Sequence, residues 1–98
     1  MYPQLEVRDV KRILNNMGFE EQPQKGTSHV HYKKTIKRPD GSDRLLKVTV
    51  DLHNAPFSRT MVRYMAAQAG VPKKTWYQAL HKKFVAPPDE DLHTVTET

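Results

Sequence analysis

The sequence predicts an α+β domain in which helices cover one face of a three-stranded antiparallel sheet. Three observations support this: an amphipathic helical pattern near the N-terminus, two alternating segments separated by a reverse-turn signal at residues 39–42, and two helical patterns after residue 57. Apolar residues that recur every three or four positions indicate a helix, whereas strict alternation indicates a half-buried strand. The expected order is therefore helix, three strands, helix, helix, and helices on one side of an antiparallel sheet bury the apolar faces of both.

The first element is a helix over residues 6–17, whose apolar residues form one stripe opposite polar residues. Gly18 follows as a C-terminal cap, and residues 19–22 form a short strand. Pro23 ends this strand, which suits a position at the edge of the sheet. The apolar positions of the helix are Val7, Val10, Ile13, Leu14 and Met17.

Residues 28–37 and 45–52 are expected to form a hairpin around the turn Pro39-Asp40-Gly41-Ser42. Successive side chains on a strand point to opposite faces. One face of the hairpin should therefore meet the core, through Val30, Tyr32, Ile36, Leu46, Val48, Val50 and Leu52. The opposite face should carry His29, His31, Lys33, Thr35, Lys47, Thr49 and Asp51.

Two helices are predicted to follow the hairpin. Ser58 is a suitable N-cap for a helix through Ala69, which Gly70 ends. Pro72 suits the first turn of an additional C-terminal helix, whose apolar residues Trp76, Leu80 and Phe84 are spaced by four. Residues 1–85 are thus expected to form a single domain. Residues 86–98 are acidic with little to bury, and we expect a flexible tail there.

The charge distribution points to a polyanionic partner. The net charge of the whole chain is +5, but residues 1–85 hold all 16 basic side chains and only 7 of the acidic ones. Such an excess on a small domain favours nucleic acid, although many basic domains bind none. There is no cysteine, no apolar run long enough for a membrane span and no signal-peptide pattern, so we expect a cytoplasmic protein without a membrane partner.

The segment Lys25-Gly26-Thr27-Ser28-His29-Val30-His31-Tyr32-Lys33 is the candidate site, because it places two imidazoles beside several lysines. Imidazole accepts or donates a proton near neutral pH, and RNA supplies its own nucleophile in the 2′-hydroxyl. Such a reaction needs no metal or other cofactor. A metal site built on His29 and His31 with Asp51 or His53 is an alternative, disfavoured by the surrounding lysines. The candidate substrate-binding residues are Lys25, Gly26, Ser28, His31, Lys33 and Lys47.

The order of elements matches that of double-stranded-RNA-binding domains. Five segments also follow each other in order: Val10-Lys11-Arg12-Ile13-Leu14 with Gly18-Phe19, Gly26-Thr27-Ser28-His29, Val48-Thr49-Val50-Asp51-Leu52-His53, Arg59-Thr60-Met61-Val62-Arg63, and Gln68-Ala69-Gly70-Val71. In these segments, over roughly residues 7–80, the chain resembles the HicA toxins of bacterial HicA–HicB toxin–antitoxin systems. Asp51 stands where the family often has proline, and residue Thr27 lengthens the usual Gly-Ser-His motif.

The resemblance implies an endoribonuclease that cleaves mRNA, with His29 as the catalytic residue and a HicB-like antitoxin protein covering the active site. The cleaved RNA sequences, the product ends, the stoichiometry of the antitoxin complex and the roles of His31 and His53 do not follow from the sequence. Two alternatives stay open. One is a non-catalytic RNA-binding module of the double-stranded-RNA-binding type, and the other is an inactive relative that still binds an antitoxin.

Overall fold

The computed structural model of the chain describes residues 3–23, 26 and 28–92. Its elements are α1 (Val7–Asn16), β1 (Glu20–Glu21), β2 (His29–Lys37), β3 (Asp43–Asp51), the 3-10 turn η1 (Leu52–Asn54), α2 (Arg59–Ala69), α3 (Lys73–Gln78) and the 3-10 turn η2 (Asp89–Asp91). The strands lie in the order β1-β2-β3, and both neighbouring pairs are antiparallel. The α+β class and the order of elements predicted from the sequence are confirmed.

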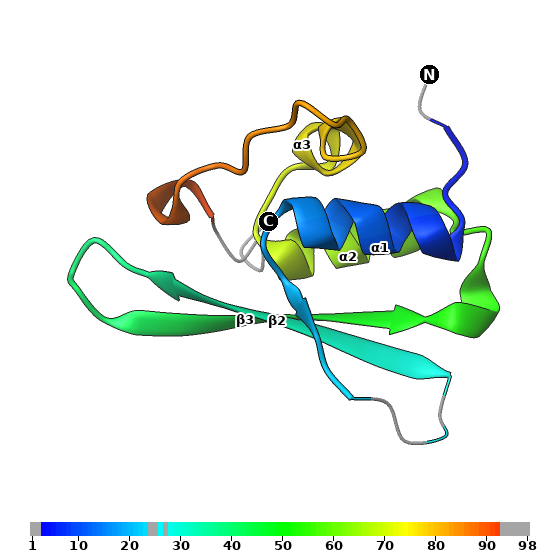
Figure 1. The fold of residues 1–98 in the computed structure, drawn as a ribbon, viewed down its shortest axis with the longest axis horizontal. Helices are drawn as coiled ribbons and strands as arrows, with labels where there is room; N and C mark the ends of the chain where they lie inside the picture. Colours follow the sequence, from blue (N-terminus) through cyan, green and yellow to red (C-terminus); the bar gives the residue numbers. More distant parts are fainter. Residues whose placement is uncertain (1–2, 24–25, 27, 93–98) are drawn as a thin grey trace.

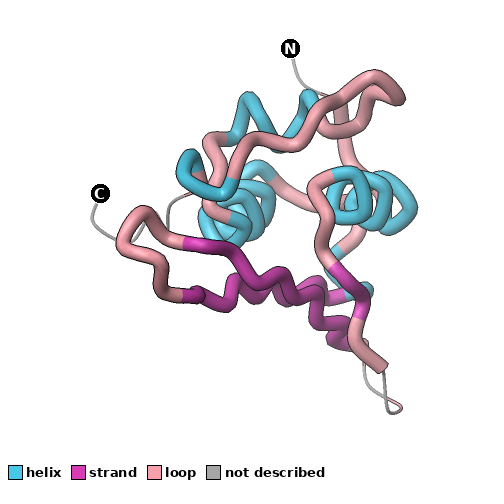
Figure 2. The backbone as a smooth tube through the Cα atoms, turned by 60° about the vertical axis from the view of Figure 1, so that its left-hand side comes forward, coloured by secondary structure: helices cyan, strands magenta, loops and turns pink. Residues whose placement is uncertain are grey.

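The helices all lie on one side of the sheet. Helices α1 and α2 lie directly over the strands, and α3 lies farther from them (Figure 1). In the second view the strands form the lower layer and the helices the upper one (Figure 2). Within the described part of the chain, the lower face of the sheet has no covering element, so the polar side chains of β2 and β3 lie on an open surface.

Helix α1 begins with a reciprocal cap, and its C-terminal end accepts a hydrogen bond from a lysine of β2. The backbone N–H of Glu6 donates to Asp9 Oδ2 at 2.9 Å, while the Glu6 side chain accepts from the backbone of Asp9. At the other end, Lys34 Nζ donates to the carbonyl of Met17 at 2.7 Å. Cations are favourable at helix C-termini. Lys34 therefore occupies the core-facing side of β2 without leaving its charge unpartnered.

The short β1 strand lies at an edge of the sheet, as its proline boundary predicted. It pairs Glu20 with Lys33 and Glu21 with Tyr32. The Tyr32 hydroxyl donates to Glu21 Oε1 at 2.8 Å. Burial, the hydrogen bond and the negative charge of Glu21 all raise the pKa of the Tyr32 phenol above its ordinary value. This contact joins β1 to the buried face of β2.

Helix α2 has the two boundaries that the sequence predicted. Ser58 Oγ accepts from the backbone N–H of Met61 at 3.1 Å, which satisfies a donor of the first turn. Gly70 ends the helix with φ of 81°, in the left-handed region that favours glycine. Between these caps the buried residues Val62, Met65, Ala66 and Ala69 pack into the core.

Helix α3 is shorter than the spacing of Trp76, Leu80 and Phe84 predicted. It ends at Gln78, so Leu80 and Phe84 lie in the turns that follow it. Asn16 Nδ2 of α1 donates to the carbonyl of Ala79 at 2.6 Å, so a carbonyl at the end of α3 that lacks an intrahelical donor has a partner. Trp76 is completely buried, which confirms that it belongs to the core.

Part of the segment predicted to be a flexible tail packs against the domain. Asp89 Oδ2 accepts from the backbone N–H of Lys37 at 3.0 Å, and Leu92 is only 8% exposed. The polar and acidic composition of residues 86–98 predicted that few of their side chains would be buried. Leu92 is buried in the core all the same. Residues 93–98 lie outside the described residues, so flexibility of the remaining tail stays a prediction.

Replacement of the buried Leu92 by alanine should lower the free energy of unfolding by about 2 kcal/mol, near the lower end for leucine truncations. The cost should be at this end because a site near the surface can relax. Chemical denaturation measures the difference. Val85→Ala is the control, since Val85 is 84% exposed. Equal stabilities for the two variants would show that the segment around η2 does not support the fold.

Candidate functional site

The candidate site lies on the open face of β2 and β3, where the strand register sets which side chains meet. The pairs are His29 with Asp51, His31 with Thr49, and Lys33 with Lys47. The backbone N–H of Leu52 donates to the Ser28 carbonyl at 2.9 Å. Hydrogen-bonded and non-hydrogen-bonded pairs alternate in an antiparallel ladder, so these three pairs are non-hydrogen-bonded ones. Side chains of such pairs lie closest together, which favours direct contact on this face.

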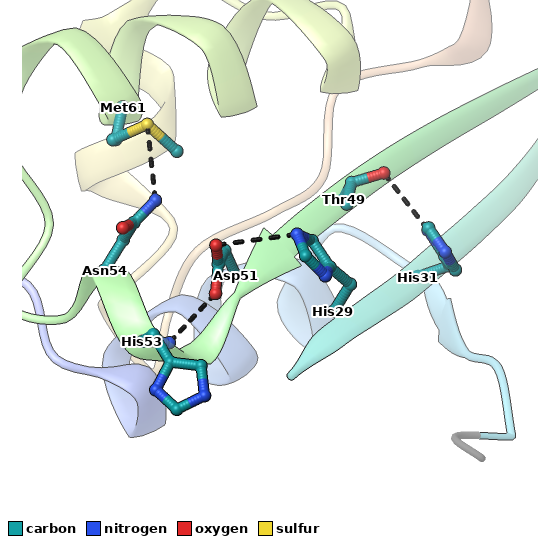
Figure 3. A network of polar contacts seen from close by, with 7 residues as sticks. All are labelled: His29, His31, Thr49, Asp51, His53, Asn54 and Met61. Carbon is teal, nitrogen blue, oxygen red and sulfur yellow. Dashed lines mark hydrogen bonds and ion pairs between the residues drawn. The ribbon is translucent and has the colours of Figure 1, made fainter. Parts of the chain in front are cut away.

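His29 and Asp51 form an ion pair when the imidazole is protonated. His29 Nε2 lies 3.5 Å from Asp51 Oδ2, with the His29 side chain 52% and the Asp51 side chain 26% exposed. The other carboxylate oxygen, Asp51 Oδ1, accepts from the backbone N–H of His53 at 3.0 Å (Figure 3). Because Asp51 is held by both the strand and η1, it can orient the His29 ring.

His31 has a different environment two residues along the same strand. His31 Nδ1 lies 3.1 Å from the hydroxyl oxygen of Thr49 (Figure 3). Desolvation lowers the pKa of the His31 imidazole below its ordinary value of 6.5, and the positive charges of Lys47, His29 and Lys33 lower it further. His31 is therefore largely neutral at pH 7, and its role differs from that of a histidine paired with a carboxylate.

The lysines of the face lie directly opposite each other. Lys33 and Lys47 are cross-strand partners, an arrangement that is destabilising for like charges in the absence of an anion. On its other side Lys33 pairs with Glu20 of β1, so one carboxylate borders the basic pair. An anionic ligand placed over β2 and β3 would relieve the repulsion between the two ammonium groups.

The turn before β2 is only partly described. Lys25 and Thr27 lie outside the described residues, so their predicted place beside His29 stays a prediction. Gly26 has φ of 66° and is exposed, and a Cβ at this position would meet no atom of the described residues within 4 Å. Its backbone conformation, not crowding, therefore favours glycine. Ser28 lies next to His29, and its carbonyl is used in the ladder with Leu52.

The structure thus brings His29, His31, Lys33 and Lys47 together on one face, as the alternation predicted. It adds two partners that sequence reasoning had not assigned, Asp51 for His29 and Thr49 for His31. The strand pattern placed both on the correct face but did not pair them, because pairing depends on the length and geometry of the turn. No group of three or more His, Asp or Glu side chains suited to a metal ion occurs among the described residues.

Comparison with known families covers most of the domain. Residues 7–71, well over half of the chain, match the family model described as the HicA toxin of bacterial toxin-antitoxin. The chain belongs to the HicA toxin family. The match includes α1, the whole sheet and α2, so every described residue of the candidate site lies within the HicA region. No curated protein sequence and no solved structure gave a significant match.

Membership of the HicA family makes the chain a toxin of a toxin–antitoxin pair. Helix α3 and the segment through Leu92 follow the matched region. They add to the core, through Trp76 and Leu92, and not to the open face. Among the described residues, no helix is long and apolar enough to cross a membrane.

The pKa of His31 should rise towards 6.5 in a Lys47→Ala variant, because removal of the nearby positive charge makes protonation easier. Titration of the His31 Cε1 proton by NMR measures this. Lys82→Ala is the control, since Lys82 lies in the exposed turn after α3. An unchanged or lowered pKa in Lys47→Ala would show that Lys47 does not act on the imidazole.

Proposed function

We propose that this HicA toxin is a metal-independent endoribonuclease that cleaves mRNA, with His29 as the proton-transfer residue. The observation that carries the proposal is the His29–Asp51 pair on an open sheet face, 3.5 Å apart and two residues from a second histidine. A carboxylate that orients an imidazole is a frequent arrangement for proton transfer. No such arrangement is needed for simple RNA binding.

The reaction uses the nucleophile that RNA carries. His29 accepts the proton of a 2′-hydroxyl while its oxygen forms a bond to the adjacent phosphorus atom. The bond between phosphorus and the 5′-oxygen breaks, and this oxygen takes a proton from solvent. Asp51 stabilises the imidazolium that forms on His29. Little of His31 is protonated at pH 7 because its pKa is lowered, so the proton comes from solvent and not from this residue.

Lys33 and Lys47 supply the positive charge that stabilises the negative charge developing on the phosphate. Both lie on the strands that carry His29 and Asp51. Charges that are already in position stabilise a developing negative charge without reorganisation. Lys25 and the backbone amides around Gly26 complete the proposed phosphate site, with Ser28 at the start of the strand. Substrate binding and proton transfer would thus share one surface.

We also propose a HicB-like antitoxin as the partner that holds the toxin inactive. Residues 1–85 carry 16 basic side chains and 7 acidic ones, and the described open face includes Lys33 and Lys47. An acidic protein that covers His29 would compete with RNA for this face and would associate quickly through charge complementarity. The proposal places the protein in the cytoplasm, where its mRNA substrate is.

Replacement of His29 by alanine should reduce RNA cleavage at least ~10²-fold, the usual contribution of a positioned proton-transfer group. RNA binding should persist, because the phosphate contacts come from lysines. Cleavage of a labelled RNA and binding of the same RNA measure the two properties. His81→Ala is the matched control, since His81 is exposed in the turn after α3.

The same assay separates the alternatives. Wild-type activity that persists in excess EDTA supports the metal-independent route. Cleavage by the His29→Ala variant at the wild-type rate would exclude His29 from the chemistry. A wild-type protein that binds RNA but never cleaves it would instead be the non-catalytic RNA-binding module.

Asp51→Asn should lower kcat roughly tenfold, a part of the about 10²-fold supplied by a positioned proton-transfer group. KM should change little, because asparagine keeps the shape of Asp51 and the proposed phosphate contacts come from lysines. Asparagine still accepts from the backbone N–H of His53, so η1 should stay in place. Asp43→Asn is the control at the other end of β3, where Asp43 pairs with Lys37. An effect confined to KM would contradict a role through His29.

Alanine at Lys33 or Lys47 should weaken RNA binding whatever the sequence, and should flatten its salt dependence. Each lost phosphate contact lowers the slope of log affinity against log salt by about 0.7 for a single strand. Binding measured at several salt concentrations gives the slope. Lys82→Ala is the control, and an equal effect there would mean that the charge of the whole domain acts diffusely.

A further inference from the structure

An open pocket of about 350 Å³ adjoins His29 at the outer edge of β3. Its lining comes from four elements: β2, β3, η1 and α2. The lining residues are His29, Thr49, Asp51, Asn54, Met61, Tyr64, Met65 and Gln68. The pocket therefore contains both members of the proposed proton-transfer pair together with groups that the chemistry does not use.

One side of α2 is turned towards this pocket. Met61, Tyr64, Met65 and Gln68 follow each other at the spacings of a single helix face. At the last of these positions, Gln68 Oε1 accepts from the backbone N–H of Thr49 at 3.1 Å. That bond joins α2 to the outer edge of β3 and sets the orientation of the amide. The Gln68 NH₂ group then remains as a hydrogen-bond donor at the pocket.

The amide of Asn54 is engaged through its nitrogen, whereas that of Gln68 is engaged through its oxygen. Asn54 Nδ2 lies 3.9 Å from the sulfur of Met61, which joins η1 to α2 (Figure 3). The carbonyl oxygen of Asn54 is left as an acceptor. The pocket thus offers one amide donor and one amide acceptor. It also has an aromatic ring in its lining, since Tyr64 lies there and is 63% exposed.

We propose that this pocket binds the base of the nucleotide next to the scissile phosphate, and so sets the base preference of cleavage. The choice of RNA as the occupant rests on the proposed function. An amide donor and an amide acceptor can each contact a polar group of a base, and an exposed aromatic ring offers a stacking surface. The volume lies at the small end of ligand pockets, where a single base fits better than a larger ligand.

The position of the pocket gives base binding a consequence for the reaction. His29 and Asp51 line the pocket from the sheet, whereas Tyr64 and Gln68 line it from α2. A base held between them places its own ribose beside the imidazole. Orientation of this kind lowers the barrier by holding the 2′-hydroxyl in position before proton transfer.

The test is a titration of the ¹⁵N-labelled wild-type protein with AMP, CMP, GMP, UMP and ribose 5-phosphate, followed by NMR. At least one nucleotide should bind about tenfold more tightly than ribose 5-phosphate, within the range for one stacked base. The largest shifts should include the backbone amides of Thr49, Tyr64 and Gln68. Equal binding of all five probes would overturn the proposal.

Two variants of Gln68 test base recognition. Gln68→Ala removes the donor, and Gln68→Glu removes it but keeps an acceptor for the Thr49 N–H. Both should reduce the affinity ratio between the best and worst nucleotide by about fivefold or more, the size of one base-edge contact. Gln78→Glu is the control, since Gln78 is exposed on α3. An unchanged ratio in both Gln68 variants would overturn the role of this amide.

Tyr64→Ala should lower the affinity for the nucleotides until it approaches that for ribose 5-phosphate. Tyr64→Phe should keep the stacking surface and the affinity. Loss of affinity in both variants would contradict stacking. These measurements need no RNA cleavage. A toxin without nuclease activity would refute the proposed function, while the pocket inference would still stand or fall on the titration.

Discussion

The pairing of β2 with β3 is the constraint on which both the core and the candidate site depend. The ladder runs from His29 opposite Asp51 to Lys37 opposite Asp43. Since side chains alternate, the same register that buries Val30 and Tyr32 also places His29 and His31 on the open face. A slip of one residue would move the imidazoles into the core and the apolar residues into water. The hydrophobic effect therefore stabilises the geometry of the site.

Two polar groups on the core-facing side of β2 have specific partners. Lys34 lies on the core-facing side of β2 but donates to the last turn of α1. Tyr32 is buried, and its hydroxyl donates to Glu21 at the edge strand. Burial of a polar group without a partner would cost stability. These two contacts instead connect α1 and β1 to the central strand, so that the face carrying His29 is supported from behind.

Helix α2 connects the core to the open face. Its apolar side packs with the core through Val62 and Met65, while Gln68 reaches the outer edge of β3. An exposed strand edge is prone to pair with other chains, and the Gln68 amide occupies one of its backbone donors. The pocket beside His29 lies at this point, and residues of η1, α2 and β3 line it together.

The sequence by itself determined the element types, the caps and the direction of most side chains. Ser58 and Gly70 bound α2 as predicted, and the histidines share a face with Lys33 and Lys47. These features are local, because periodicity and capping depend on residues within a few positions of each other. The family resemblance drew on the same local motifs.

Only the tertiary structure decided which groups meet across the chain. Asp51 becomes the partner of His29 through strand register, and Gln68 and Asn54 join them through the packing of α2 and η1. Helix α3 ends at Gln78, and the carbonyl of its cap residue Ala79 accepts from Asn16, which is far away in the sequence. Contacts between distant segments depend on how whole elements pack, and local periodicity carries no information about that packing.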